Sequence, residues 1–143
     1  MHHVSDGYEV DITLSWGDPL FSSLADPFSP HALSAQEQSQ RFGYNCDYIS
    51  CLPQENGNVV LCVNHESTVA QLMFDDEHGY SASKKENIEV EMMAHGMTIV
   101  ELSKRDERWS VVYKSPLNRR ITAHTPTIFS GPVAGNERMK TPE

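Results

Sequence analysis

Apolar and polar residues alternate near the start of the chain, over residues 8–16. In an extended backbone every second side chain points to the same face, so this segment would have one apolar and one polar face. The pattern predicts a half-buried β-strand that ends at the Gly-Asp-Pro of 17–19. Its apolar face consists of Tyr8, Val10, Ile12, Leu14 and Trp16.

The middle of the chain has the pattern of a β-hairpin. After a Ser- and Pro-rich loop over 21–35 and a short helical turn over 36–41, strand-forming residues return at 42–52. Residues 53–58 supply a turn, because Asn-Gly readily adopts positive φ. The uninterrupted apolar run at 59–63 is typical of a strand buried on both faces. We therefore expect the second strand of this hairpin to be the more central one.

A short helix is predicted farther along. Ser83 and Glu86 fit a capping box, which begins a helix over 84–95 with Gly96 just beyond its end. At helical spacing, one face of this segment carries Ile88, Met92 and His95.

Two further apolar segments, 97–102 and 109–113, flank a charged turn at 105–108 and predict a second hairpin. Short strands joined by tight turns, with one short helix, favour a mainly β fold, either a sandwich or the blades of a β-propeller. The chain of 143 residues has the length of one domain. Residues 118–143 hold few apolar anchors, so we expect an incomplete part of a larger domain.

The net charge of −9 limits the partners of the chain. An acidic protein neither neutralises the phosphates of nucleic acid nor binds an anionic membrane surface. No apolar run reaches the length of a membrane span, and the first residues lack an apolar signal segment. We expect no nucleic-acid or membrane partner, and either a cytoplasmic protein or one whose targeting segment is removed.

The three cysteines are too few and too unevenly spaced for a disulfide framework. In a strand over 44–52, Cys46 and Cys51 would point to opposite faces and could not bridge each other. Together with Cys62 they are predicted to be small, half-buried thiols.

The candidate metal site lies where the buried strand ends, at Asn64, His65 and Glu66. A carboxylate beside a core strand is costly to bury unless it is paired, hydrogen-bonded or bound to a cation. The Asn carbonyl and the Glu carboxylate suit a hard cation such as calcium, and His extends the choice to iron or zinc. Asn45 and Asp47 could add oxygen ligands. The alternative for residues 64–66 is that they are solvated polar residues where the strand ends. The alternative for Asn45 and Asp47 is a hydrogen bond beside the turn.

Arg119 and Arg120 are the candidate substrate-binding residues, because guanidinium groups make bidentate contacts with phosphate. The alternatives are a solvated pair or structural partners for the many carboxylates. The sequence contains no nucleophile elbow, P-loop or dinucleotide-binding motif, and it assigns no catalytic residue.

Short stretches, taken in order across nearly the whole chain, resemble the PhoX-type alkaline phosphatases. They are Gly-Asp-Pro-Leu-Phe at 17–21, Phe-Gly-Tyr-Asn-Cys-Asp-Tyr at 42–48, Val-Asn-His-Glu at 63–66, Ala-His-Gly-Met at 94–97, Asn-Arg-Arg-Ile-Thr at 118–122 and Ser-Gly-Pro-Val-Ala-Gly at 130–135. Cys46 stands where the family's Tyr-Asn-Asn-Asp-Tyr pattern has Asn, which weakens a ligand role for this strand.

The resemblance implies a periplasmic or secreted phosphomonoesterase built on a β-propeller, with iron and calcium as cofactors and a phosphate ester as substrate. It implies that residues 1–143 are the N-terminal portion of such an enzyme, and that much of the metal centre comes from segments that follow. Asn64 and Glu66 would lie near the metals. The family's twin-arginine export signal is absent from this sequence, so the localisation rests on the relatives.

Two functions remain open. The chain is either part of a phosphatase, inactive alone because its ligand set is incomplete, or a noncatalytic β-rich interaction module on the same scaffold. In both cases an apolar surface should be exposed where later blades dock, and the isolated chain would associate with those blades or with itself.

Overall fold

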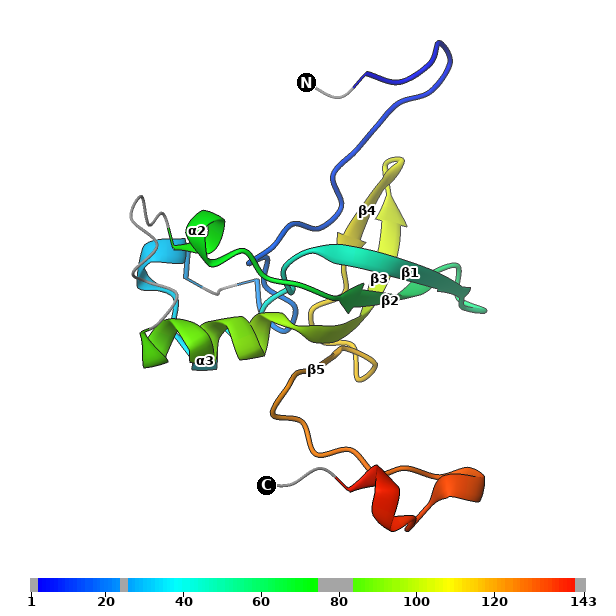
Figure 1. Ribbon diagram of the computed structural model, residues 1–143. Helices are drawn as coiled ribbons and strands as arrows, with labels where there is room; N and C mark the ends of the chain where they lie inside the picture. Colours follow the sequence, from blue (N-terminus) through cyan, green and yellow to red (C-terminus); the bar gives the residue numbers. More distant parts are fainter. Residues whose placement is uncertain (1–2, 24–25, 75–83, 141–143) are drawn as a thin grey trace.

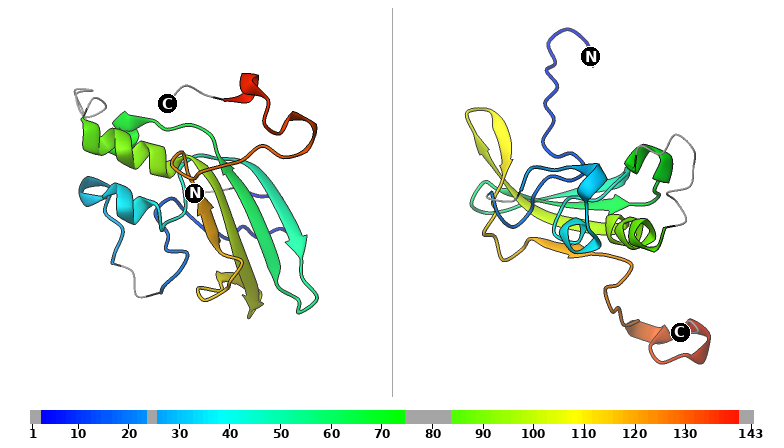
Figure 2. Two further views of the ribbon diagram at one scale, coloured as in Figure 1. Left: turned by 90° about the horizontal axis from the view of Figure 1, so that it is seen from below. Right: turned by 90° about the vertical axis from the view of Figure 1, so that its left-hand side faces the viewer.

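The computed structural model describes residues 3–23, 26–74 and 84–140. One antiparallel sheet and several short helices make up the body, and a chain segment leaves it toward each terminus (Figures 1 and 2). The elements in chain order are η1 (Pro30–Ala32), α1 (Ala35–Gln38), β1 (Cys46–Pro53), β2 (Val59–His65), α2 (Ala70–Met73), α3 (Lys85–Ala94), β3 (Gly96–Arg105), β4 (Arg108–Val111), β5 (Arg119–Ile121), η3 (Gly131–Val133) and η4 (Glu137–Met139).

The sheet is built around β3. β2 pairs with one edge of β3, from Val59 opposite Leu102 to His65 opposite Gly96. The other edge of β3 is shared, because β5 pairs with its beginning and β4 with its end. β1 lies outside β2, so the strand order is β1-β2-β3-β4 with β5 beside β3.

Both predicted hairpins are confirmed, and β2 is the more central strand of the first. The second hairpin turns at Asp106 (φ 47) and Glu107 (φ 65). Positive φ at both central residues matches the twist of the flanking strands. A mainly β fold with few short helices is therefore correct. The sheet formed by the described residues is open, and the propeller remains a prediction.

The core lies mainly on one face of β2 and β3. Its buried members are Leu20, Phe42, Val63, Val100 and Leu102, so the loop before β1 covers the central strands. A second cluster lies at α3 and α2, where Met73, Val90 and Ala94 are buried. Trp16 and Tyr44 pack against these three residues. These two clusters hold the sheet and helices together through apolar burial.

The predicted helix is present as α3, but its buried face differs from the predicted one. Ser83 lies outside the described residues, and the N-cap is Lys84, which makes no side-chain capping bond. The buried face is formed by Val90, Met93 and Ala94, whereas Ile88 is 43% exposed. The helix packs against α1 rather than only against the sheet, and this tertiary contact selects the buried face.

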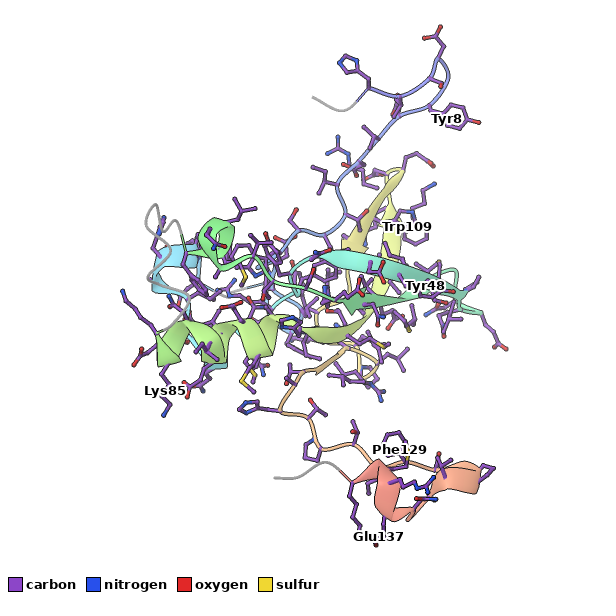
Figure 3. All side chains as sticks on the ribbon, in the orientation of Figure 1. Tyr8, Tyr48, Lys85, Trp109, Phe129 and Glu137 are labelled. Atoms are coloured by element: carbon purple, nitrogen blue, oxygen red, sulfur yellow. The ribbon has the colours of Figure 1, made fainter. Side chains whose placement is uncertain are left out.

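The predicted strand over 8–16 is wrong. The structure gives these residues no strand, and Tyr8 and Ile12 are 74% and 66% exposed. Figure 3 shows Tyr8 well away from the sheet. Alternation specifies two faces, but a strand also needs a hydrogen-bonded neighbour, and no described strand pairs with this segment. Only its end joins the body, where Trp16 Nε1 donates to Gln38 Oε1 at 2.7 Å.

The expected coreless tail is present beyond β5, a strand that the sequence pattern did not indicate. Residues 123–140 run away from the sheet, and Ile128 is 95% exposed (Figure 2). No helix within the described ranges is long and apolar enough to cross a membrane.

The cysteine predictions are corrected in two respects. All three thiols are free, but Cys46 and Cys51 are exposed and only Cys62 is half-buried. A register shift between Cys46 and Ile49 places Cys46 opposite His65 and Cys51 opposite Leu61, so both cysteines oppose the same face of β2. The inserted residue of this β-bulge cancels the simple parity argument.

Candidate functional site: a polar junction at the end of the sheet

His65 closes β2 in a tightly packed position. Its side chain is 3% exposed, and its ring meets the Phe42 ring edge-on with centroids 4.8 Å apart. A Cβ on Gly43 would lie 2.4 Å from the imidazole, so only glycine allows the chain before β1 to pass this close. The packing of His65 therefore depends on the loop that precedes the sheet.

Thr98 links His65 to Arg120 across three strands. The Thr98 Oγ1 lies 2.8 Å from His65 Nε2 and accepts a hydrogen bond from Arg120 Nη1 at 3.1 Å. Thr98 is fully buried. We call His65, Thr98 and Arg120 the polar junction. Because the Thr98 hydroxyl accepts from the guanidinium, it can donate to the unprotonated Nε2 of His65.

The imidazole of His65 is held neutral. Burial, with a smaller contribution from the nearby Arg120 charge, lowers the pKa of His65 from 6.5 to about 4. Burial also lowers the pKa of Arg120 to about 10, which leaves the guanidinium charged at neutral pH. The polar junction therefore contains one cation.

Arg120 ties β5 to the end of α3. Its Nη2 donates to the carbonyl oxygens of Met93 at 2.7 Å and His95 at 3.0 Å. The last carbonyls of a helix lack partners within the helix and carry partial negative charge, so a cation stabilises them. Gly96 follows at φ 99, as predicted for the residue after the helix, and a Cβ there would lie 2.0 Å from the Ile121 carbonyl oxygen.

A second buried polar group crosses the middle of β3. The Glu101 carboxylate accepts hydrogen bonds from Asn58 Nδ2 at 2.6 Å and from the Ser115 hydroxyl. These two donors lower the pKa of Glu101 below its ordinary value. Asn118 accepts from the Glu101 backbone N–H at 2.8 Å and donates to the Leu20 carbonyl at 2.9 Å. This group anchors the loops on both sides of the sheet.

The predicted metal ligands lie beside the polar junction, on its outer side. Asn64 is half-buried and opposes Met97, whereas Glu66 is exposed. The Glu66 backbone N–H donates to the Asn45 carbonyl at 3.3 Å, and Asn45 Nδ2 donates to Ser67 Oγ at 2.7 Å. The structure thus brings Glu66 and Asn45 together, while the exposed Asp47 makes no described contact with them.

These residues do not form a metal centre by themselves. Across the described ranges no group of three or more His, Cys, Asp or Glu side chains could hold a metal ion. His65 directs its Nε2 to Thr98 and is buried within the protein, so it is not oriented for an exposed cation beside Glu66. The fit to a complete iron or calcium site is poor, and Glu66 and Asn64 could add only peripheral oxygen ligands.

The two predicted substrate-binding arginines have different environments. Arg119 is exposed, and its Nε donates to the Leu117 carbonyl at 3.4 Å. Arg120 is half-buried and has its Nη groups directed at Thr98 and the end of α3. Structural contacts therefore occupy Arg120, and Arg119 is the one of the pair that is accessible to a ligand.

Sequence reasoning missed Thr98, Glu101 and Asn118 as members of these polar groups. Glu101 did carry a signal, since it interrupts an apolar segment between Val100 and Leu102. A carboxylate in such a position must find hydrogen-bond partners when it is buried. Those partners are distant in sequence, so the pattern could not name them.

The sequence stretches singled out above meet in space around the polar junction. Gly17 N–H donates to the Phe42 carbonyl at 3.1 Å, and Tyr44 N–H donates to the Ala94 carbonyl at 3.2 Å. Arg120 then joins the fifth stretch to the fourth. Only the stretch at 130–135 lies apart, in the exposed tail.

The fold and these contacts define an antiparallel β-sheet domain whose loops and helix are fastened by buried polar side chains. The chain belongs to the family described as Alkaline phosphatase PhoX, whose model matches residues 1–143. The suspected resemblance is thereby confirmed.

A solved structure of Pseudomonas fluorescens PhoX in complex with vanadate, a transition state analogue, is similar to this chain at 28% sequence identity and a TM-score of 0.81. The match covers 95% of this chain and 23% of that chain. The present chain therefore spans less than a quarter of the length of the relative. No curated protein matches it.

Proposed function

We propose that this chain is the N-terminal portion of a metal-dependent alkaline phosphatase that hydrolyses phosphomonoesters. The match of the PhoX family model to residues 1–143 carries the proposal. The similar Pseudomonas structure, which binds a transition-state analogue, supports it. Tight binding of such an analogue is expected of a site that stabilises the transition state of a reaction. By the same relationship we propose a β-propeller for the full-length protein and a periplasmic or secreted location.

Iron and calcium are the proposed cofactors of the full-length protein, and metals of this kind polarise phosphoryl oxygens. The described part of this chain offers no complete ligand set, so most ligands are proposed to come from other segments. The role of this chain is then structural support. The buried His65 fixes the end of β2, and β2 in turn places Asn64 and Glu66 at the border of the sheet. Arg119, which is exposed, is the proposed contact to the phosphate ester.

The proposal is tested with a generic ester, p-nitrophenyl phosphate. A full-length protein that contains this chain should hydrolyse the ester and lose activity when a chelator removes its metals. The purified 143-residue chain should show no activity above background. Metal-dependent turnover by the isolated chain would disprove the fragment proposal.

Elemental analysis separates the proposal from its rival. Stoichiometric iron and calcium in the active full-length protein support the enzyme. A well-folded full-length protein without these metals and without activity would instead indicate the noncatalytic interaction module. An Arg119→Ala variant of the full-length protein should raise KM, with Lys114→Ala as a control for the loss of an exposed cation.

A further inference from the structure

The outer edge of β1 is an unusual surface for a folded protein. Among the described strands β1 pairs only with β2, so its other edge is open. Seven of its eight residues are exposed, and only Ser50 is half-buried. The apolar side chains of Tyr48, Ile49 and Leu52 are 67%, 56% and 50% exposed. Neither face of this strand is covered over most of its length.

Natural proteins usually protect such an edge. Lysine, internal proline and covering loops prevent an exposed strand from pairing with another chain. β1 has the sequence Cys-Asp-Tyr-Ile-Ser-Cys-Leu-Pro, with one charged residue, no lysine and a proline only at its last position. Open backbone donors and acceptors beside exposed apolar side chains are the features that accept an added strand.

The comparison with PhoX shows how much polypeptide of the relative lies outside the match. The sheet of the present chain has the same shape as part of a protein in which more than three quarters of the polypeptide lies outside the match. We propose that the outer edge of β1 pairs with a strand from the PhoX-type polypeptide that this chain does not cover. This inference rests on family membership and on the geometry of β1, and it holds whether or not the assembled protein is a phosphatase.

A second copy of this chain fits the edge less well. Each copy has a net charge of −9, so pairing two copies brings like charges together. The one charged residue of β1, Asp47, is acidic as well. Like-charge pairs across strands are destabilising. A strand from a different polypeptide segment does not bring a second copy of this −9 charge to the edge.

Hydrogen exchange tests the proposal directly. The isolated chain is compared with a full-length chimera in which it replaces the matched portion of Pseudomonas fluorescens PhoX. In the isolated chain the outward-facing amides of β1 should exchange rapidly. In the chimera they should exchange at least about 10-fold more slowly, because an added strand protects them. The amides that already bond to β2 provide the internal reference.

Paired variants test the same contact by stability. Tyr48→Lys with Leu52→Lys should lower the melting temperature of the chimera but leave that of the isolated chain almost unchanged. Leu72→Lys is the matched control, since Leu72 is an exposed apolar residue on α2 at 72% exposure. Equal exchange of the β1 amides in both proteins, or equal effects of the edge and control variants, would overturn the proposal.

Two further outcomes are decisive. If the isolated chain forms a dimer that protects β1 and is lost in the Tyr48→Lys, Leu52→Lys variant, the occupant is a second copy and the proposal is wrong. If the chimera does not accumulate, the isolated chain is expressed together with the remaining PhoX segment, and co-purification sensitive to the edge variants is expected. The matched portion of Pseudomonas fluorescens PhoX itself is the positive control for this co-purification. If that portion binds the remaining segment and the present chain does not, the proposal is also overturned.

Discussion

The polar junction and the outer edge of β1 differ in whether their side chains are withdrawn from water. At the junction a histidine, a threonine and an arginine are withdrawn from water and share hydrogen bonds. At the β1 edge Tyr48, Ile49 and Leu52 are left in water. Proteins normally do the opposite, because burying polar groups is costly and burying apolar groups is favourable.

This difference separates what the chain completes by itself from what it leaves for a neighbour. The junction is built from three strands of one chain, β2, β3 and β5, and each strand supplies one of the hydrogen-bonded side chains. The β1 edge has hydrogen-bonding and apolar capacity that the described chain does not use. We therefore expect substitutions at the junction to affect the isolated chain strongly, and substitutions of exposed apolar residues to affect it little.

Gly96→Ala should have the largest effect. The new Cβ would lie 2.0 Å from the Ile121 carbonyl oxygen, in addition to the strain of φ 99. We expect a loss of more than about 4 kcal/mol in the free energy of unfolding, measured by urea denaturation. Gly57→Ala is the matched control, because Gly57 also has positive φ but nothing lies within 4 Å of its added Cβ. The control should lose roughly 1–2 kcal/mol. Equal losses would contradict the close contact of α3 with β5.

Arg120→Met should be next in size. This change removes the donor to Thr98 and to the carbonyls at the end of α3 while it keeps an apolar stem. Charge-assisted hydrogen bonds of this kind predict a destabilisation of roughly 2–3 kcal/mol. Arg119→Met, one residue away and exposed, should cost less than about 0.5 kcal/mol. The urea midpoints of the two variants are compared. Similar midpoints would show that the contacts of Arg120 do not stabilise the junction.

The junction should also weaken in mild acid. The pKa of His65 is lowered to about 4 in the folded chain from 6.5. The unfolded chain therefore binds more protons between these values, and stability falls as the pH falls through this window. Between pH 7 and pH 5 we expect a loss of about 2 kcal/mol from this residue. A His65→Asn variant should be less stable at pH 7 but should lose less on acidification. An unchanged pH slope in that variant would exclude His65 as the source.

Exposed apolar residues of the two terminal segments should give the smallest effect. Ile12→Asp and Ile128→Asp change side chains that are 66% and 95% exposed. Each should alter the unfolding free energy of the isolated chain by less than about 0.5 kcal/mol. Val100→Asp, at a fully buried position of β3, should prevent folding and serves as the contrasting control. A large loss from either exposed substitution would show that the terminal segments pack within the isolated chain.

The sequence pattern was sufficient for elements whose partners are close by. The Asn-Gly turn and the charged turn after Arg105 each join neighbouring strands, so local pattern and tertiary structure agree. Residues 8–16 have an equally clear alternation, yet no described strand pairs with them. The β-bulge between Cys46 and Ile49 likewise leaves no mark in the alternation. The strand that is available for pairing, rather than the periodicity of the sequence, determines the structure of both segments.

The candidate site was predictable only as separate pieces. Asn64, His65, Glu66, Arg119 and Arg120 were all named from the sequence, but the division of roles among them was not visible. His65 and Arg120 turn inward, while Glu66 and Arg119 remain exposed. That division depends on Thr98 and on the carbonyl oxygen of Met93 in α3. Thr98 lies more than 20 residues from both His65 and Arg120 in the sequence, and Met93 lies more than 20 residues from Arg120. The metal and substrate roles of the exposed residues remain predictions.

The hydrogen bond from Asn118 to the Leu20 carbonyl has a consequence for synthesis. Its two residues are 98 positions apart, so this particular contact cannot form until Asn118 has left the ribosome. Contacts of such long sequence separation form late and slow the folding of a domain. The bonds of Gly17 and Asp18 to Phe42 can form much earlier, so the residues around Leu20 gain their contacts in two separate stages of synthesis.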